Sequence, residues 1–223
     1  MPLAPRMIGV LLLTALSTLP VALPAAPASP EVLAQAVQRH YDTIRDFSAD
    51  FEHRYRGGTL RTQVVERGTA AFKKPGLMRW VYDAPERKEF VSDGRRIYAY
   101  IPQDRQVVVS QVPSDADAPL PVLFLAGKGN LTRDFVVALA GDATPATTTL
   151  TLTPRNPGAD YAQMLLVVQL PGLRIIGLTT VDLQGGTSAF SFTHVKENQG
   201  LSDKQFAFRI PKGVDVLTDD GSH

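Results

Sequence analysis

The chain has 223 residues, of which 44% are hydrophobic and 20% are charged, and its formal net charge is only +1. Proteins that bind nucleic acid mainly through phosphate groups carry a clustered basic excess, so this balance argues against nucleic acid as the main partner. The sequence contains no cysteine, which excludes both disulfides and a lipidated cysteine. Stability must therefore come from a hydrophobic core, for which the chain is long enough.

Residues 1–28 have the features of a secretory signal peptide. Arg6 lies in a short N-terminal region, residues 7–19 form an apolar run, and Ala26-Pro27-Ala28 fits the small-residue cleavage pattern. The apolar run is shorter than the roughly 20 residues that span a bilayer. We therefore predict export, cleavage after Ala28, and a mature domain of residues 29–223. Its 22 basic residues, one fewer than the 23 of the whole chain, equal its 22 acidic residues.

The mature domain opens with a helix signal. Ser29 suits the N-cap position, Pro30 the first turn, and Glu31 the positive end of the helix dipole. Apolar residues then recur at spacings of three and four, which predicts one buried face over residues 32–44. They are Val32, Leu33, Ala36, Val37, Tyr41 and Ile44.

From Phe47 the pattern changes to a period of two, which is typical of a half-buried strand. A Gly57-Gly58 turn leads to a return strand over residues 60–73. Arginines gather along this predicted hairpin, either as a solvated strand face or as a docking surface for an acidic partner. They are Arg54, Arg56, Arg61 and Arg67.

Residues 72–102 form the centre of the predicted sheet. Three short strands are expected at 77–82, 88–92 and 96–101, and Asp93-Gly94 between the last two is a strong hairpin signal. Because side chains alternate along a strand, Met78 and Trp80 share one large apolar face.

The rest of the chain continues the β pattern after an interruption. A short apolar helix is expected at 122–126, and residues 131–139 fit either a helix or a strand. Further strands are expected at 107–112, 147–153, 161–170, 173–183, 187–196 and 205–209. The predicted fold is mainly β: one strongly curved antiparallel sheet of about 10–11 strands, forming an incomplete barrel covered by two or three short helices.

Catalytic and metal-binding motifs are not found in this sequence. The histidines lack ligand spacing, and no nucleophile elbow or phosphate-binding glycine loop occurs. The acidic cluster of Asp83, Glu86 and Glu89 fits a solvated turn, as Ser92-Asp93-Gly94 fits a hairpin. We expect surface histidines, no enzyme activity, no metal and no cofactor. The histidines are His40, His53, His194 and His223.

Three motifs follow one another in the centre of the chain. Lys74-Pro75-Gly76-Leu77-Met78-Arg79-Trp80 is followed by Ser92-Asp93-Gly94 and then by Ile97-Tyr98-Ala99-Tyr100. In this order they resemble the LolA family of periplasmic lipoprotein carriers. Phe47-Ser48-Ala49-Asp50-Phe51 and residues 206–214 lie where the family has similar blocks. The resemblance covers roughly residues 31–216.

The resemblance implies an apolar cavity between sheet and helices and a carrier that is a monomer. The cavity would be lined by Phe51, Phe72, Met78, Trp80, Phe90, Leu123 and Phe124. Lys74 stands where the family usually has an arginine that ties the lid helices when the cavity is empty; a solvated loop lysine is the alternative. Expected partners are acylated lipoproteins, an inner-membrane ABC release complex of the LolCDE type and an outer-membrane receptor of the LolB type.

Other functions are compatible with such a fold. A periplasmic lipid- or glycolipid-binding sensor is the first alternative, and an envelope hydrolase is the second. A LolB-like receptor would need a lipidated cysteine, which this chain lacks. A sigma-factor regulator with a LolA-like first domain would need a second domain of about a hundred residues.

Overall fold

The computed structural model describes residues 29–57, 63–112, 129–141, 144–156 and 161–219. The predicted signal peptide, Gly58, Arg61 and the predicted helix 122–126, with Leu123 and Phe124, lie outside these described residues. Within them, every helix is too short or too polar to cross a membrane.

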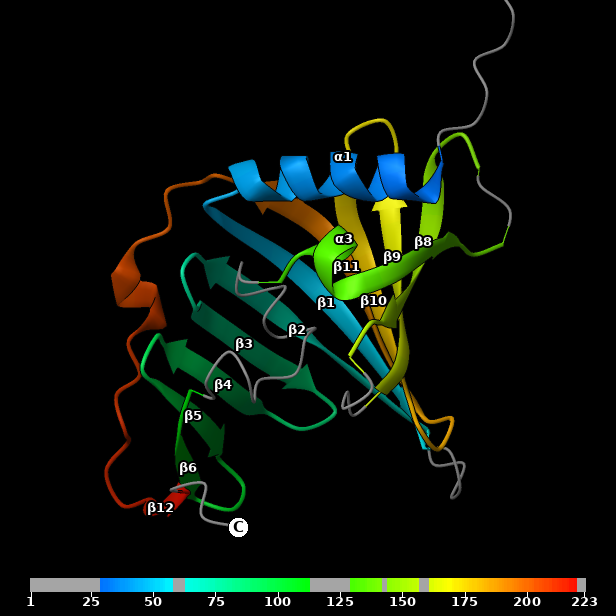
Figure 1. Cartoon of the computed structure of the whole chain (residues 1–223). Helices are drawn as coiled ribbons and strands as arrows, with labels where there is room; N and C mark the ends of the chain where they lie inside the picture. The colour runs from blue at the N-terminus through cyan, green and yellow to red at the C-terminus, as the bar shows by residue number, and fades with distance from the viewer. Residues whose placement is uncertain (1–28, 58–62, 113–128, 142–143, 157–160, 220–223) are drawn as a thin grey trace, which may run out of the picture.

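One curved 12-stranded sheet forms the body of the molecule (Figure 1). Its order is β12-β6-β5-β4-β3-β2-β1-β11-β10-β9-β8-β7. The strands are β1 (Asp46–Arg56), β2 (Gln63–Lys73), β3 (Leu77–Ala84), β4 (Lys88–Asp93), β5 (Arg96–Ile101), β6 (Gln106–Gln111), β7 (Phe135–Leu139), β8 (Thr147–Pro154), β9 (Tyr161–Gln169), β10 (Arg174–Asp182), β11 (Thr187–Glu197) and β12 (Asp215–Asp219). This confirms the predicted incomplete barrel, although β12 adds an unpredicted strand that pairs with β6 in parallel.

Helix α1 (Pro30–Thr43) lies on the concave side of the sheet (Figure 1). Its N-terminus is capped as predicted, because the Ser29 hydroxyl accepts a hydrogen bond from the Val32 amide at 3.3 Å. The buried stripe differs in part from the prediction, since Val32 is 53% exposed. The helix contacts α3, β7 and β10, and its buried stripe starts at Ala34, two residues after Val32. Its buried residues are Ala34, Val37, Gln38 and Tyr41.

Residues 131–139, which fit either a helix or a strand by sequence, contain both. Helix α3 (Leu131–Asp134) is a single turn, and β7 follows at once from Phe135. The Asn130 side chain caps the turn by accepting hydrogen bonds from the amides of Thr132 and Arg133. Leu131 of α3 and Phe135 of β7 are both fully buried in the core.

The predicted strand at 205–209 is wrong. The chain forms a 3₁₀ turn, η1 (Asp203–Phe206), and then runs irregularly across the convex side of the sheet, where η1 contacts β3 and β4. Phe206 is 1% exposed, and the Phe208 ring stacks on Tyr98 with centroids 5.3 Å apart. Phe206 and Phe208 alternate as the residues of a strand do, but they anchor this C-terminal segment to the sheet.

The two faces of the sheet follow from alternation. Trp80 and Phe90 are paired on neighbouring strands and lie on the concave side, whereas Arg79 and Val91 are paired on the convex side. The main core lies on the concave side, beneath α1 and α3, and includes Val37, Phe72 and Leu150. The helices and the C-terminal segment therefore cover opposite faces.

Gly68 provides a test of this packing. It pairs with Phe51 of β1 and Tyr82 of β3, at a bulge, and a Cβ at this position would lie 1.9 Å from the Val81 carbonyl oxygen. Because the clash is with backbone, we expect Gly68→Ala to lower the free energy of unfolding by about 2 to 3 kcal/mol. Urea denaturation of the purified protein measures this change.

The matched control is Gly172→Ala, since a Cβ there meets no described atom within 4 Å. Its effect should stay within about 0.5 kcal/mol. Equal stability of the two variants would show that β2 and β3 do not approach as closely as described.

Candidate functional site

Seven aromatic rings form one continuous surface on the concave side of the sheet, named here the aromatic face. They belong to Phe51, Phe72, Trp80, Tyr82, Phe90, Phe190 and Phe192. Trp80 is central, with its ring centroid 5.0 Å from that of Phe51 and 5.1 Å from those of Phe72 and Phe190. These distances are typical of favourable edge-to-face and tilted pairs.

The structure places the predicted lining residues on this face as far as it describes them. Phe51 and Phe72 are buried, while Met78, Trp80 and Phe90 are half-buried and pack against the same core. A large apolar surface that stays partly accessible on one face is typical of a binding site. Their role in lipid binding stays a prediction.

The predicted lining residues omit three members of the aromatic face, Tyr82, Phe190 and Phe192. Phe190 and Phe192 alternate along β11 and point to the concave side beside Trp80. Their spacing of two within a predicted strand was the available signal. It could not be used without knowing that β11 pairs with β1, because only this pairing brings them to Phe51.

Beneath α1 the described residues enclose little space. A cavity of about 20 Å³ lies between the helix and the sheet, lined in part by Tyr41, Ile44, Phe47 and Phe192. This volume admits about one water molecule and no acyl chain. An acyl chain could enter this cavity only if the helix moved.

Lys74 joins the C-terminal end of α1 to the end of β2. Its Nζ donates a hydrogen bond to the Tyr41 carbonyl oxygen at 2.6 Å and lies 3.9 Å from the centre of the Tyr41 ring. Burial lowers the pKa of Lys74, with Asp42 opposing the shift. A cation at a helix C-terminus is favoured by the helix dipole, so this contact stabilises α1 in its position over the sheet.

A second polar contact fastens the middle of α1. The Gln38 side-chain oxygen accepts a hydrogen bond from the Leu131 amide of α3 at 2.9 Å, and its nitrogen donates to Asp42 at 2.8 Å. Gln38 is 8% exposed. Polar contacts thus attach α1 both to the strand end and to α3.

A group of four polar side chains, named here the polar cluster, adjoins the aromatic face. It comprises Ser188, His53, Glu66 and Lys88. His53 lies 2.9 Å through Nε2 from the Ser188 hydroxyl and 3.1 Å through Nδ1 from Glu66 Oε2. Lys88 Nζ lies 2.6 Å from Glu66 Oε1. His53 also stacks on Phe190, with centroids 4.1 Å apart.

The prediction of surface histidines is therefore wrong for His53. Its side chain is 14% exposed, and its acidic partner is Glu66. Burial lowers the pKa of His53, while Glu66 opposes this shift. The pKa of Glu66 is lowered because Lys88 and His53 together outweigh the effect of its burial. The cluster therefore holds a neutral imidazole beside an ion pair at pH 7.

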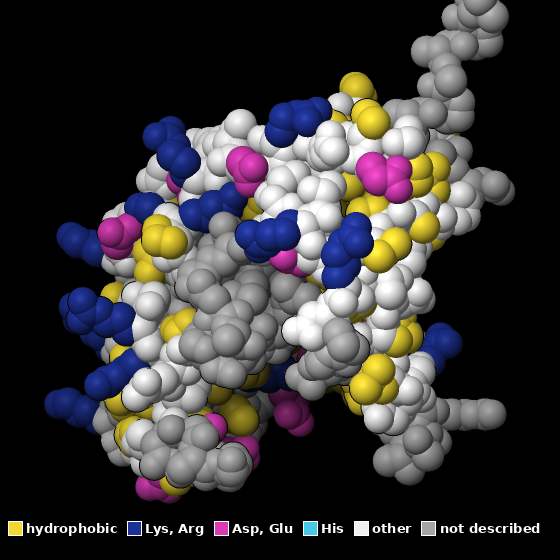
Figure 2. Space-filling model, in the orientation of Figure 1, with side chains coloured by type: hydrophobic (Ala, Val, Ile, Leu, Met, Phe, Trp, Pro, Cys, Tyr) yellow, Lys and Arg dark blue, Asp and Glu magenta, His cyan; other side chains and the backbone are white. Residues whose placement is uncertain are grey.

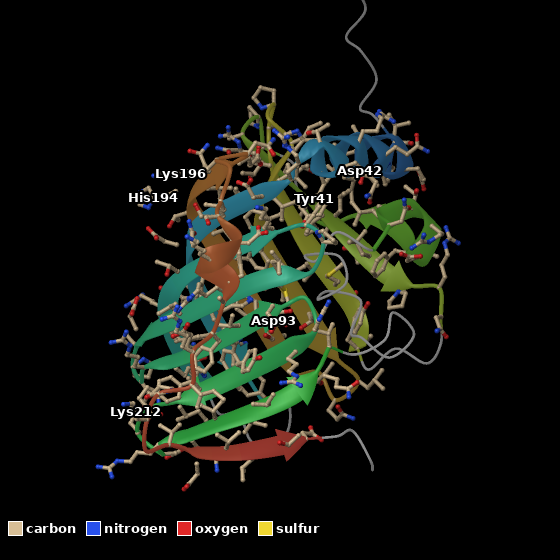
Figure 3. The ribbon with its side chains drawn as sticks, turned by 90° about the vertical axis from the view of Figure 1, so that its left-hand side faces the viewer. Tyr41, Asp42, Asp93, His194, Lys196 and Lys212 are labelled. Carbon is tan, nitrogen blue, oxygen red and sulfur yellow. The ribbon has the colours of Figure 1, made fainter. Side chains whose placement is uncertain are left out.

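The remaining candidate groups have structural roles. Asp93 accepts hydrogen bonds from the amides of Arg95 and Arg96 at 2.9 and 2.8 Å, as expected for a hairpin turn. His194 pairs with Asp50 at 2.8 Å, and its side chain is 79% exposed. Figure 3 places His194 and Lys196 on the outer side of the sheet, away from Tyr41. Within the described ranges, no group of three or more metal-binding side chains forms.

Two arginines of the first hairpin are exposed and paired with an acidic residue. Arg54 and Arg67 both pair with Glu52, at 2.6 and 2.8 Å. Figure 2 shows basic side chains interspersed with acidic ones on the face in view. Such exposed pairs contribute little to stability.

Comparison with known proteins identifies relatives over most of the chain. The sequence model of the family described as "Outer membrane lipoprotein carrier protein LolA" matches residues 42–209. A relative from Chromohalobacter salexigens, named outer-membrane lipoprotein carrier protein, is 32% identical over 183 residues, 81% of this chain and 84% of the relative. A relative of the same name from Bordetella pertussis is 29% identical over 196 residues, 88% of this chain and 91% of the relative.

A solved structure supports the fold alone. An uncharacterized conserved protein from Thermus thermophilus superposes with a TM-score of 0.54 at 16% identity. The match covers 83% of this chain and 99% of that one. The incomplete barrel is thus shared with a protein of very different sequence.

The lowered pKa of His53 predicts a pH dependence of stability. Because the unfolded histidine titrates near 6.5 and the folded one below it, the unfolded state binds a proton first as the pH falls. Stability present above pH 6.5 should therefore decrease towards pH 5, by at most about 1.4 kcal/mol per pH unit. His53→Gln should flatten this slope in urea denaturation series.

His194→Gln is the control, since it removes an exposed histidine. It should keep the slope of the parent protein. A slope unchanged in His53→Gln would show that the imidazole is not desolvated in the folded state.

Proposed function

Because the chain belongs to the LolA family of outer membrane lipoprotein carrier proteins, we propose that it is a soluble periplasmic carrier of lipoproteins. It binds the acyl chains of lipoproteins released from the inner membrane and delivers them to an outer-membrane receptor. It acts without catalysis and as a monomer, after export directed by residues 1–28. The observation that carries this proposal is the aromatic face around Trp80.

The size of the apolar ligand explains why a carrier is needed. A lipoprotein with three acyl chains of about 15 methylenes each exposes on the order of 35 kcal/mol of apolar surface, at about 0.8 kcal/mol per methylene. Transfer through water is negligible at that cost. A protein that covers the chains during transfer removes most of it.

The aromatic face suits such a ligand. Trp80 and Phe90 are half-buried, and Met78 beside them has a flexible thioether that adapts to ligands of different shape. The rings are large and apolar, and they contact one another, as Trp80 does Phe190 and Tyr82 does Phe90. A surface of this kind binds alkyl chains through area rather than through directed bonds.

The position of α1 supports the role of a lid. The cavity of about 20 Å³ under the helix is too small for an acyl chain. Lys74 and Gln38 hold the helix through polar contacts, which exchange with water when the helix moves. We propose that Lys74 restrains α1 in the empty carrier and that cargo binding displaces the helix.

The direction of transport implies two further partners. An inner-membrane ABC complex of the LolCDE type would supply the lipoprotein, and a LolB-type receptor would accept it at the outer membrane. Neither partner is fixed by the described residues. Both follow from the proposed role as a carrier.

Capture of cargo tests the proposal directly. The tagged full chain, expressed in a Gram-negative host and isolated from its periplasm, should retain acylated lipoproteins detectable by mass spectrometry. Trp80→Ser should reduce their yield about tenfold or more, since it removes the central ring of the aromatic face. Recovery of free fatty acids alone, or of no lipid, would refute the carrier role.

Leu183→Ser is the matched control for this experiment. Leu183 is an apolar residue that is 65% exposed, in the turn after β10. Its replacement should leave the lipoprotein yield unchanged. An equal loss in both variants would mean that Trp80 acts only through general hydrophobicity.

The restraint on α1 has its own test. In Lys74→Met the aliphatic chain remains and the charged donor is lost. The free energy that holds α1 over the sheet should therefore fall by about 1.5 kcal/mol or more. Amides of α1 should then exchange with deuterium about tenfold faster, as measured by mass spectrometry.

The control is the neighbouring Lys73→Met. Lys73 Nζ binds the Leu201 carbonyl oxygen and Asp203 of the C-terminal segment, at 2.7 and 2.5 Å. Exchange should rise in that segment while α1 keeps its protection. Unchanged deuterium exchange of the α1 amides in Lys74→Met would show that Lys74 does not restrain α1.

A further inference from the structure

The polar cluster lies at a defined point on the concave side of the sheet. Along β1 the inward residues Phe47, Ala49 and Phe51 are 9%, 5% and 3% exposed. His53 follows as a partly buried residue, and Tyr55 at the end is 41% exposed. This face therefore grades from an apolar end beneath α1 to an accessible end beyond His53.

An ion pair beside aromatic rings requires an explanation. Burying charged groups is costly, and an apolar replacement of similar volume is often as stable or more so. Yet Glu66 and Lys88, with side chains 12% and 27% exposed, lie on the same face as Tyr82. Lys88 Nζ is 4.5 Å from the centre of the Tyr82 ring. Side chains that only formed part of the core would not need to be charged.

The hydrogen bonds of the cluster define what it offers to a ligand. Glu66 is an acceptor for both Lys88 and His53, so the Nδ1 of a neutral His53 is the protonated nitrogen. Its Nε2 then accepts the hydroxyl proton of Ser188. The Ser188 oxygen retains lone pairs for an incoming N–H, and the Lys88 ammonium has three protons, more than its bond to Glu66 uses.

One acceptor and one cationic donor match the groups at the polar end of an acyl chain. An amide supplies both an N–H and a carbonyl, and an ester supplies a carbonyl. The stacking of His53 on Phe190, which is itself 5.1 Å from Trp80, makes the polar cluster continuous with the aromatic face. A chain lying on the rings would reach the cluster with its carbonyl end.

We propose that Ser188, His53, Glu66 and Lys88 form a subsite that binds the amide and ester groups of acylated cargo. The hydrocarbon lies along the aromatic face, with its methyl end towards α1. This inference rests on the proposed carrier function and adds the orientation of the ligand. Ser188 and Lys88 contact the linkage, whereas His53 and Glu66 position them.

Two probes separate the subsite from the aromatic face. A synthetic triacylated cysteinyl lipopeptide carries amide and ester groups, whereas 1-N-phenylnaphthylamine is an apolar fluorophore with neither group. Binding of both to the full chain is measured by fluorescence titration and competition. Ser188→Ala and Lys88→Met should each weaken lipopeptide binding about tenfold and change fluorophore binding by less than about twofold. Trp80→Ser should weaken both.

Two further variants control the serine. Ser188→Thr keeps the hydroxyl and should restore lipopeptide affinity. Ser191→Ala removes an exposed serine from the opposite face of the same strand, and its binding should equal that of the parent chain.

The outcomes distinguish the two proposals. A parent chain that does not bind the lipopeptide would refute the carrier function and this inference together. Lipopeptide binding that is equal in Ser188→Ala, Lys88→Met and Ser191→Ala would refute the subsite alone. Release of free fatty acid that is lost in Ser188→Ala would show a hydrolytic Ser-His-Glu arrangement and overturn the binding role.

Discussion

Alternation of side chains along a single sheet is the constraint on which the rest of this structure depends. It separates Trp80 from Arg79 and Phe90 from Val91, so one set of strands builds two unlike surfaces. The concave surface collects aromatic rings from five neighbouring strands, and the convex surface receives the C-terminal segment, with Phe206 buried. Four of these rings are buried, whereas those of Trp80, Phe90 and Phe190 are partly buried.

The attachment of α1 differs from the packing of the sheet. Of its buried residues, Ala34 and Val37 are small and Gln38 is polar, so Tyr41 buries the largest apolar area. Lys74 and Gln38 add hydrogen bonds to carbonyl and amide groups that water can also satisfy. A helix held in this way is displaced at lower free energy than a strand of the sheet. Lysine supplies one point charge for this contact, where a guanidinium would form a planar fork.

The sequence predicted the strands well because their period of two is strong, as in the alternation of Met78, Trp80 and Tyr82 along β3. It failed at 205–209, where Phe206 and Phe208 alternate but anchor a loop, and it missed β12, whose residues are all exposed. The polar cluster could not be predicted. His53 meets Glu66 across one hairpin but Ser188 from 135 residues away. Only the pairing of β1 with β11 brings them together.

Lys73 and Lys74 show how the two covered faces are joined. Phe72 points to the concave core, so Lys73 points to the convex side and binds Asp203 of the C-terminal segment. Lys74 follows after the end of β2 and returns to Tyr41 of α1. The end of β2 therefore binds both covers of the sheet, α1 on the concave face and the C-terminal segment on the convex face. β2 is itself paired on both sides, with β1 and β3. The two covers therefore share one rigid anchor, and Asn198, which follows β11, also donates a hydrogen bond to the Thr43 carbonyl oxygen at the end of α1.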